Sequence, residues 1–416
     1  MKTRTLICVL VIFAFGISAQ FSIADDFDWP RWRGPNGDGI SVETDWNPET
    51  LSDGLKVVWK TNVGIGYSNM AIKGKYLYTM GNNYKDDTVY CLNVENGEED
   101  WQYSYRSAGS GYGSHTTPTI DGKYVYTLST EGHLYCFISK NGKVKWEKNI
   151  VTEYGAVRPN WGFSGSPVIV GDLVIITVNK SGMALDKKTG KKVWISEPGE
   201  KLEVNIPQTG SEYATPVIYE YKGMRSAAIF SSRGLYSVDV ETGEQQWFYN
   251  WKPYMKVSVA DPIIFDNKVF ISCAYRAACV LLDISQNEPK AIWKNHNMRN
   301  HYSTIVLIDG YMYGIDGYYS EAKLLTCIDF KTGEKMWSEN LNPVSLMAAD
   351  DKLIILNEQG TLLIAEATPS TYKEISSGTI PDQKGFEKWW APPVLLRGRI
   401  YCRSSTGDLV CIDVSK

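Results

Sequence analysis

The segment "ALDKKTGKKVW", residues 184–194, joins a Thr-Gly turn to a tryptophan through three residues. The motif returns as "SVDVETGEQQW" at 237–247 and as "CIDFKTGEKMW" at 327–337. Aligning the chain on the final residue gives a series at intervals of 42, 45, 48, 53, 46 and 44 residues: Trp59, Trp101, Trp146, Trp194, Trp247, Trp293 and Trp337. A degenerate eighth copy, without the Trp or the Gly, ends near Ile375. A period of this length is typical of propellers and solenoids.

Each repeat has the pattern of four short strands. Residues 115–146, "HTTPTIDGKYVYTLSTEGHLYCFISKNGKVKW", hold four apolar segments separated by tight glycine turns, which is the pattern of a propeller blade. Eight first strands can be counted, and the last unit supplies only three strands before residue 416. The missing fourth is "LKVVW", residues 55–59. We therefore predict an all-β, eight-bladed β-propeller whose ring is closed by the N-terminal strand, which removes open sheet edges.

The composition and the N-terminus point to an exported globular protein. A hydrophobic content of 43% is typical of a folded chain, and a formal net charge of −4 offers nothing to nucleic acid. Lys2 and Arg4, followed by an apolar run and by small residues up to Ala24, predict a signal peptide over residues 1–24. We expect residues 25–54 to form an N-terminal strap and residues 55–416 the propeller. The mature protein should be a monomer in the periplasm or outside the cell, without a membrane span or a lipid-attachment cysteine.

Four cysteines occupy the first position of the motif, where Ala184 and Ser237 stand in other copies: Cys91, Cys136, Cys327 and Cys411. A position shared by Cys, Ala and Ser predicts a small buried slot. Two pairs are placed to face each other across hairpins, Cys402 with Cys411 and Cys273 with Cys279. Both disulfides are left open, because cross-strand bridges are geometrically demanding.

The motif resembles the tryptophan-docking motif of pyrroloquinoline-quinone-type eight-bladed propellers. Its pattern is a small residue, Asp, Thr-Gly and Trp, and residues 184–194 match it at every position, whereas 281–293 is two residues longer and lacks the glycine. The resemblance implies that each Trp lies over a neighbouring blade, against the small residue and the glycine. A docked indole needs a flat partner without a side chain, which a glycine turn provides. In repeat number, the chain is also similar to the propeller subunit of the outer-membrane β-barrel assembly machinery.

The segment "DWPRWRGPNGDGIS", residues 28–41, resembles the opening of exported quinone-repeat propellers of uncharacterised function. It has two interpretations. It is either a strap that Trp29 and Trp32 pin to the propeller, which we favour for a segment so rich in Trp, Pro and Gly, or a polar clamp. The clamp would consist of Arg31, Arg33, Asn36 and Asp38.

Propellers bind ligands near the axis, so the segments that begin the eight first strands, together with the loops that enter them, hold the candidate site. Strand alternation places two rings of side chains on one side of these segments and a ring of small residues on the other. The two rings that share one side are rich in aromatic and hydroxyl side chains. These side chains would either hold a planar or sugar-like ligand or line a wet channel. The candidate ligand-binding residues are Tyr67, Asn69, His115, Tyr213, Asp261, Tyr302 and Trp390, with Arg158 and Trp161 from the loops. His301 is expected on the same rim.

Two functions compete. The first is a non-catalytic scaffold without a cofactor, which binds a protein or peptide partner or a small ligand at the axial mouth. The second, implied by the resemblance, is an alcohol or sugar dehydrogenase that uses pyrroloquinoline quinone with Ca²⁺. That chemistry needs several oxygen ligands and a base. The strand rings offer one carboxylate, Asp261, with Asn69 and Thr215 as weak helpers, and the adjacent cysteines typical of alcohol-oxidising members are absent. The sequence therefore favours the scaffold and predicts no catalytic or metal-binding residues.

Overall fold

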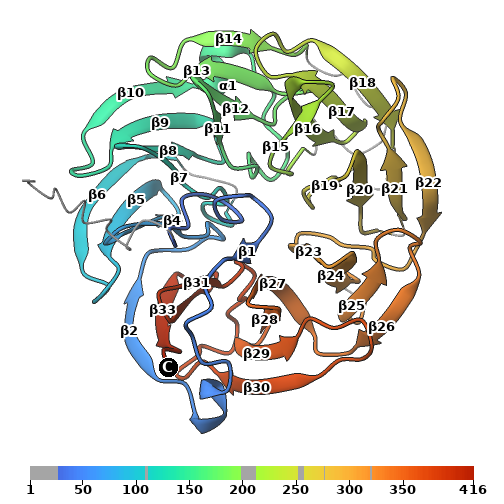
Figure 1. The fold of residues 1–416 in the computed structure, drawn as a ribbon. Helices are drawn as coiled ribbons and strands as arrows, with labels where there is room; N and C mark the ends of the chain where they lie inside the picture. Colours follow the sequence, from blue (N-terminus) through green and yellow to red (C-terminus); the bar gives the residue numbers. More distant parts are fainter. Residues whose placement is uncertain (1–26, 108–110, 198–211, 252–256, 276, 319–320) are drawn as a thin grey trace, which may run out of the picture.

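The computed structural model describes residues 27–416 except for 108–110, 198–211, 252–256, 276 and 319–320. The predicted signal peptide at 1–24 lies outside the described residues. The described chain forms eight sheets arranged as blades around a central axis (Figure 1), so the predicted all-β, eight-bladed propeller is confirmed. The described part of the chain includes no helix with the length and apolar character needed to cross a bilayer.

Each blade is an antiparallel sheet whose strands run outward from the axis in sequence order. The first four blades are β3–β6, β7–β10, β11–β14 and β15–β18. Their bounds are β3 Ala71–Lys73, β4 Tyr76–Asn82, β5 Asp86–Asn93, β6 Glu99–Arg106, β7 Thr119–Asp121, β8 Tyr124–Leu128, β9 His133–Ile138, β10 Val144–Asn149, β11 Val168–Val170, β12 Leu173–Ile176, β13 Met183–Asp186, β14 Lys192–Ile195, β15 Val217–Tyr221, β16 Met224–Ser231, β17 Gly234–Asp239 and β18 Gln245–Asn250.

Blades five and six are β19–β22 and β23–β26, and the last two blades take strands from the N-terminal segment. The bounds are β19 Ile263–Phe265, β20 Lys268–Ser272, β21 Cys279–Asp283, β22 Lys290–Asn295, β23 Val306–Ile308, β24 Tyr311–Asp316, β25 Leu324–Asp329, β26 Lys335–Glu339, β27 Pro343–Ala349, β28 Lys352–Asn357, β29 Thr361–Glu366, β30 Glu374–Thr379, β31 Val394–Leu396, β32 Arg399–Arg403 and β33 Asp408–Asp413. Two short helices, η2 Thr50–Asp53 and α1 Ile150–Tyr154, lie outside the blades.

The N-terminal segment closes the ring. Strand β2, Val57–Asn62, pairs antiparallel with β33 and completes the eighth blade, as the sequence predicts, with Trp59 opposite Cys411. Strand β1, Ile40–Ser41, adds an inner parallel strand to β27 of the seventh blade, which the sequence did not indicate. At the seam between the last and first blades, the buried Arg403 guanidinium donates to the carbonyls of Ser68 (2.5 Å) and Gly64 (3.1 Å). Burial lowers the pKa of Arg403 to about 9.

The tryptophans dock from blade to blade. Trp101 of β6 covers Gly142 of the next blade so closely that a Cβ on this glycine would lie 2.5 Å from the indole. Its Nε1 donates to the carbonyl of Ser139 (2.8 Å). The same arrangement joins Trp59 with Gly97, Trp146 with Gly190, Trp194 with Gly243 and Trp293 with Gly333. Trp247 and Trp337 differ, since neither covers a glycine of the described residues. Trp337 Nε1 still donates to the carbonyl of Thr368 (2.9 Å), whereas Trp247 Nε1 has no hydrogen-bond partner among the described residues. The docking that the resemblance implies is therefore confirmed at five of the seven tryptophans.

The first motif position is the predicted small buried slot. Cys91, Cys136, Cys327 and Cys411 are buried, and each pairs across the strand with its own docking tryptophan or, for Cys411, with Trp59. All seven cysteines of the described chain are free. Cys402 stands opposite Val410, and Cys411 stands opposite Tyr401. This register turns the two thiols to opposite faces of the sheet, so the hairpin does not offer a disulfide.

Candidate ligand-binding site at the propeller axis

The segments that lead into the inner strands converge on one cavity of about 500 Å³. We expected these residues to be the first residues of strands, but the inner strands begin only after them, for example β7 at Thr119 and β11 at Val168. The preceding Pro118 and Pro167 have no N–H to donate to a ladder, so regular pairing starts after the proline. The axial side chains therefore lie on loops held by the ends of the blades.

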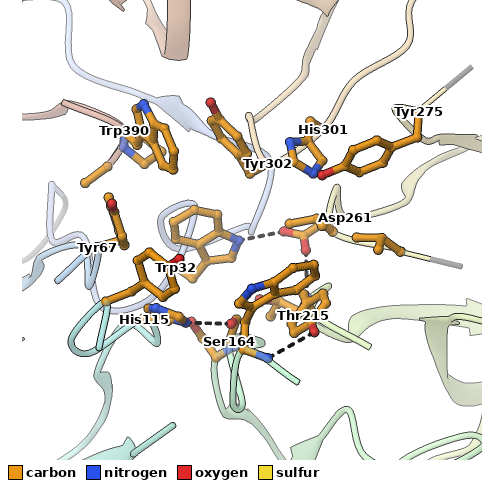
Figure 2. Close-up of a pocket in the computed structure, with 18 residues that line it drawn as sticks. Trp32, Tyr67, His115, Ser164, Thr215, Asp261, Tyr275, His301, Tyr302 and Trp390 are labelled. Carbon is orange, nitrogen blue, oxygen red and sulfur yellow. Dashed lines mark hydrogen bonds between the residues drawn. The ribbon is translucent and has the colours of Figure 1, made fainter. Parts of the chain in front are cut away.

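Seven of the nine candidate residues line this cavity (Figure 2): Tyr67, His115, Trp161, Tyr213, Asp261, Tyr302 and Trp390. Asn69 and Arg158 are not among its lining residues. Asn69 is buried, and its Oδ1 accepts from the backbone N of Met70 (2.8 Å), so it caps its own strand. Arg158 donates from Nε to the carbonyl of Thr130 (3.1 Å), which lies between β8 and β9 of the second blade.

The ring that contains Asn69 and Asp261 connects the blades to one another. The backbone N of Asn69 donates to Thr117 Oγ1 (3.3 Å), and the backbone N of Thr117 donates to Ser166 Oγ (2.9 Å). The series continues from Ser166 N to Thr215 Oγ1 (3.1 Å) and from Thr215 N to Asp261 Oδ1 (2.7 Å). In blades two to five, one side-chain oxygen thus accepts from the preceding blade, which gives these side chains a structural role.

The N-terminal segment crosses the axis and forms the floor of the cavity (Figures 1 and 2). Trp29 pairs with Ile72 of the first blade, and Pro30 accepts from the backbone N of Ile120 in the second. At the far end, Gly39 accepts from Ala348 of the seventh blade (3.0 Å). Trp32 lies between these anchors and lines the cavity. These contacts support the interpretation of this segment as a strap.

The residues of the alternative polar clamp are engaged within the strap and with the sixth blade. Arg31 donates to the carbonyl of Pro35 (2.9 Å), and Asp38 Oδ1 accepts from the backbone N of Ile40 (2.9 Å). The buried Arg33 donates to the carbonyls of Asp38 (3.0 Å) and Ile305 (2.5 Å), while Asn36 is exposed. Apart from Asn36, these polar groups hold the strap in place.

Asp261 is engaged on both carboxylate oxygens. Oδ1 accepts from the backbone N of Thr215 (2.7 Å), and Oδ2 accepts from Trp32 Nε1 (2.6 Å). The guanidinium of Arg33 lies 3.8 Å from Oδ2. Burial raises the pKa of Asp261, and Arg33 and Trp32 oppose that rise. The carboxylate therefore anchors the strap.

Aromatic side chains form one continuous wall. Tyr67 and Trp390 stack with ring centroids 5.1 Å apart and planes inclined by 19°, and Trp390 stacks on Tyr302 at 4.4 Å and 22°. His115 contacts Tyr67 at one end of this arc, and His301 contacts Tyr302 at the other. On the opposite side, Trp161 contacts Tyr213 (5.8 Å). All of these rings belong to residues that line the cavity.

The two histidines of the wall are neutral near physiological pH. Burial lowers the pKa of His115 and that of His301 to about 4. His115 Nδ1 lies 3.0 Å from Ser164 Oγ, while its Nε2 is buried without a hydrogen-bond partner among the described residues. His301 Nδ1 is likewise buried without a hydrogen-bond partner among the described residues.

A carboxylate behind the wall is held by two lysines. Glu358 Oε2 accepts from Lys323 (2.7 Å), Oε1 lies 2.9 Å from the ammonium of Lys388, and Trp390 Nε1 lies 3.4 Å from Oε1. Burial opposes ionisation of Glu358, but the two lysines outweigh it and lower its pKa to about 2. Glu358 therefore positions Trp390, and the two lysines balance its negative charge.

The described lining does not fit a Ca²⁺-bound quinone. Ca²⁺ takes six to eight oxygen ligands, normally with several carboxylates. Asp261 is the lining carboxylate, and both of its oxygens are already engaged. No group of three or more His, Cys, Asp or Glu side chains placed to hold a metal occurs among the described residues.

Comparison with known proteins identifies the family. A family model described as outer membrane protein assembly factor BamB matches residues 51–158 and 85–339, which together span more than half of the chain. The chain belongs to this family. The resemblance inferred from the repeat is confirmed, and members of the BamB-like family share the propeller described above.

Solved structures and a curated relative extend the comparison in two directions. BamB from Moraxella catarrhalis is 14% identical with a TM-score of 0.60, covering 86% of this chain and 97% of that one. Quinohemoprotein alcohol dehydrogenase from Comamonas testosteroni is 13% identical with a TM-score of 0.71, covering 94% and 81%. Both likenesses show the fold alone. The 1-butanol dehydrogenase (quinone) of Thauera butanivorans is 27% identical over 165 residues, 37% of this chain, and the match spans 26% of that enzyme.

Three aromatic lining residues were not predicted for the site: Trp32, Tyr112 and Tyr275. Tyr112 and Tyr275 come from loops whose length differs between blades, so no alignment on the repeat places them. Tyr275 also has φ of 55°, a conformation that the sequence does not suggest for a tyrosine. Trp32 was expected only to pin the strap to the propeller. The sequence signal for this role was the richness of residues 28–41 in Trp, Pro and Gly.

Proposed function

We propose that this protein is an exported, non-catalytic propeller that works by binding a ligand in the axial cavity. The observation that carries the proposal is the state of Asp261, because both oxygens of the lining carboxylate are committed to Trp32 and Thr215. To act as a metal ligand or a general base, this carboxylate would have to share or give up the hydrogen bonds that anchor the strap. The remaining described lining is aromatic, aliphatic, hydroxyl-bearing or neutral imidazole, which suits recognition.

Export and an envelope location belong to the same proposal. They are supported by the predicted leader at 1–24 and by the family description, which names an outer membrane assembly factor. A protein or peptide partner would meet the mouth of the cavity at Tyr112 and Trp161, which are 56% and 40% exposed.

The test is reconstitution with pyrroloquinoline quinone and Ca²⁺, followed by dye reduction with 1-butanol, other alcohols and sugars. We expect no substrate-dependent dye reduction, because the single lining carboxylate of the described residues, Asp261, would have to act as metal ligand and base while it also holds the strap. Saturable quinone binding that is lost in Asp261→Ala, together with alcohol oxidation by the unmodified protein, would overturn the proposal.

The second candidate is a quinone-dependent alcohol dehydrogenase. It is favoured by the likeness of 165 residues to a 1-butanol dehydrogenase, although the chain covers about a quarter of that enzyme. The same reconstitution decides between the two functions.

A further inference from the structure

The floor of the axial cavity is an uncovered aromatic face. Trp32 is fixed at its edge by the hydrogen bond from Nε1 to Asp261 (2.6 Å). Figure 2 shows its indole nearly face-on at the centre of the labelled side chains. The other aromatic side chains of the wall pair with one another, as Tyr67, Trp390 and Tyr302 do. Trp32 therefore offers a rigid apolar platform to a ligand.

The wall is closed to a planar molecule that would insert between its rings. Trp390 is covered by Tyr67 on one side and by Tyr302 on the other, with interplanar angles of 19° and 22°. A ligand must therefore lie on the floor, with its perimeter facing the wall.

Two polar atoms of lining residues have no partner among the described residues. His115 Nε2 and His301 Nδ1 belong to residues that line the cavity, but the atoms themselves are buried. Burying such an atom without a partner is unfavourable, so a ligand that turns the ring toward the cavity and supplies a partner gains affinity. A neutral imidazole nitrogen either donates or accepts, and a hydroxyl group matches both roles.

The described lining has no unpaired charged side chain that could bind a charged ligand. It contains no lysine or arginine, and its carboxylate is paired with Trp32, Thr215 and Arg33. A neutral ligand with one apolar face and hydroxyl groups around its edge therefore matches the described lining.

Building on the proposed binding function, we propose that the cavity binds a neutral saccharide, with one pyranose ring on Trp32 and its hydroxyls reaching His115 and His301. A pyranose has axial C–H groups that form an apolar face and equatorial hydroxyls that radiate from its rim. An aromatic ligand without hydroxyls would cover Trp32 but leave both imidazole nitrogens unpaired. The cavity volume of about 500 Å³ lies within the range of small-molecule sites, about 300–1,000 Å³.

The test is calorimetric titration of the purified protein with maltose, cellobiose and N,N′-diacetylchitobiose, with tryptophan fluorescence as a second signal. We expect saturable one-site binding of at least one disaccharide, with a Kd between about 1 µM and 1 mM. His115→Phe and His301→Phe keep a ring of similar size and remove the polar atoms. Each should weaken binding about tenfold. His296→Phe, at an exposed histidine, is the matched control and should bind as the unmodified protein does.

The outcomes separate this inference from the proposed function. No saturable binding of any of the three disaccharides up to about 10 mM, ten times a weak Kd of about 1 mM, overturns the saccharide assignment. Saccharide binding that is unchanged in both histidine variants overturns the placement of the sugar. Quinone binding without dye reduction would show that the cavity takes a planar ligand instead of a saccharide. The proposed binding function would then stand, and the saccharide assignment would fall. Dye reduction with 1-butanol overturns both.

Discussion

The outer rim of the propeller and the wall of its axial cavity are built from the same repeat and differ in what they keep constant. At the rim, five blade junctions share one contact, a tryptophan over a glycine with its indole bonded to a carbonyl. At the axis, equivalent positions carry Tyr67, His115, Tyr213, Tyr302 and Trp390, which line a cavity. Repetition at the rim stabilises the ring, whereas variation at the axis creates a surface with one shape and one polarity.

The largest expected effect comes from removing the closing strand. Deletion of the chain through Trp59 removes the strap and the first half of β2, exposes part of the edge of β33 and opens the floor of the cavity. We expect aggregation or the loss of a cooperative thermal transition, because an unpaired edge recruits other chains. Size-exclusion chromatography and calorimetry measure this. Trp59→Ala, which keeps the strand, should remain a monomer with a lowered melting temperature, and a well-behaved monomer from the deletion would contradict ring closure.

Tryptophan docking at the rim is the next effect. Trp101→Ala should lower the free energy of unfolding by about 3–5 kcal/mol, because the ring is 8% exposed and its removal leaves a cavity. Trp194→Ala should cost less, since this ring is only partly buried. Thr371→Ala, at an exposed position of the degenerate repeat, should change stability by less than about 0.5 kcal/mol. Urea unfolding measures all three, and equal losses would mean that docking is not the stabilising contact.

The glycine side of the same contact has a matched pair. Gly142 and Gly122 both have positive φ, 66° and 56°, but a Cβ at Gly142 would meet the indole of Trp101 at 2.5 Å and one at Gly122 would meet nothing within 4 Å. Gly142→Ala should therefore be about 1–3 kcal/mol more destabilising than Gly122→Ala. If urea midpoints show equal losses, the backbone conformation and not the docked indole requires glycine at the rim.

The last effect, at the axis, is absent at neutral pH and appears only on acidification. Burial holds the pKa values of His115 and His301 at about 4, below their ordinary 6.5. Between pH 6.5 and 4 the unfolded chain binds more protons, so the stability from these neutral histidines is complete above pH 6.5 and is lost as the pH falls toward 4. The double variant His115→Asn/His301→Asn should have a melting temperature that declines less over this window. Parallel curves for the variant and the unmodified protein would show that the two rings titrate normally.

The repeat by itself was enough to predict the fold and to bring most of the candidate residues to one cavity. The period and the Gly turns specify eight blades, and the three-strand last unit requires β2. Six of the candidate residues that line the cavity come from the aligned inner segments, and Trp161 comes from a loop. Asn69 and Arg158 do not line the cavity, because a side chain's partner, the Met70 backbone or the Thr130 carbonyl, depends on contacts that alignment does not reveal.

Only the tertiary structure decided what the axis offers to a ligand. Trp32 and Asp261 are 229 residues apart in sequence, and no motif relates them, yet their hydrogen bond fixes the cavity floor and occupies the lining carboxylate. The neutrality of His115 and His301 likewise arises from burial, which depends on eight blades meeting at once. Sequence patterns determine structure that repeats along the chain, whereas contacts between blades and strap depend on the closed ring, where distant segments share one small space.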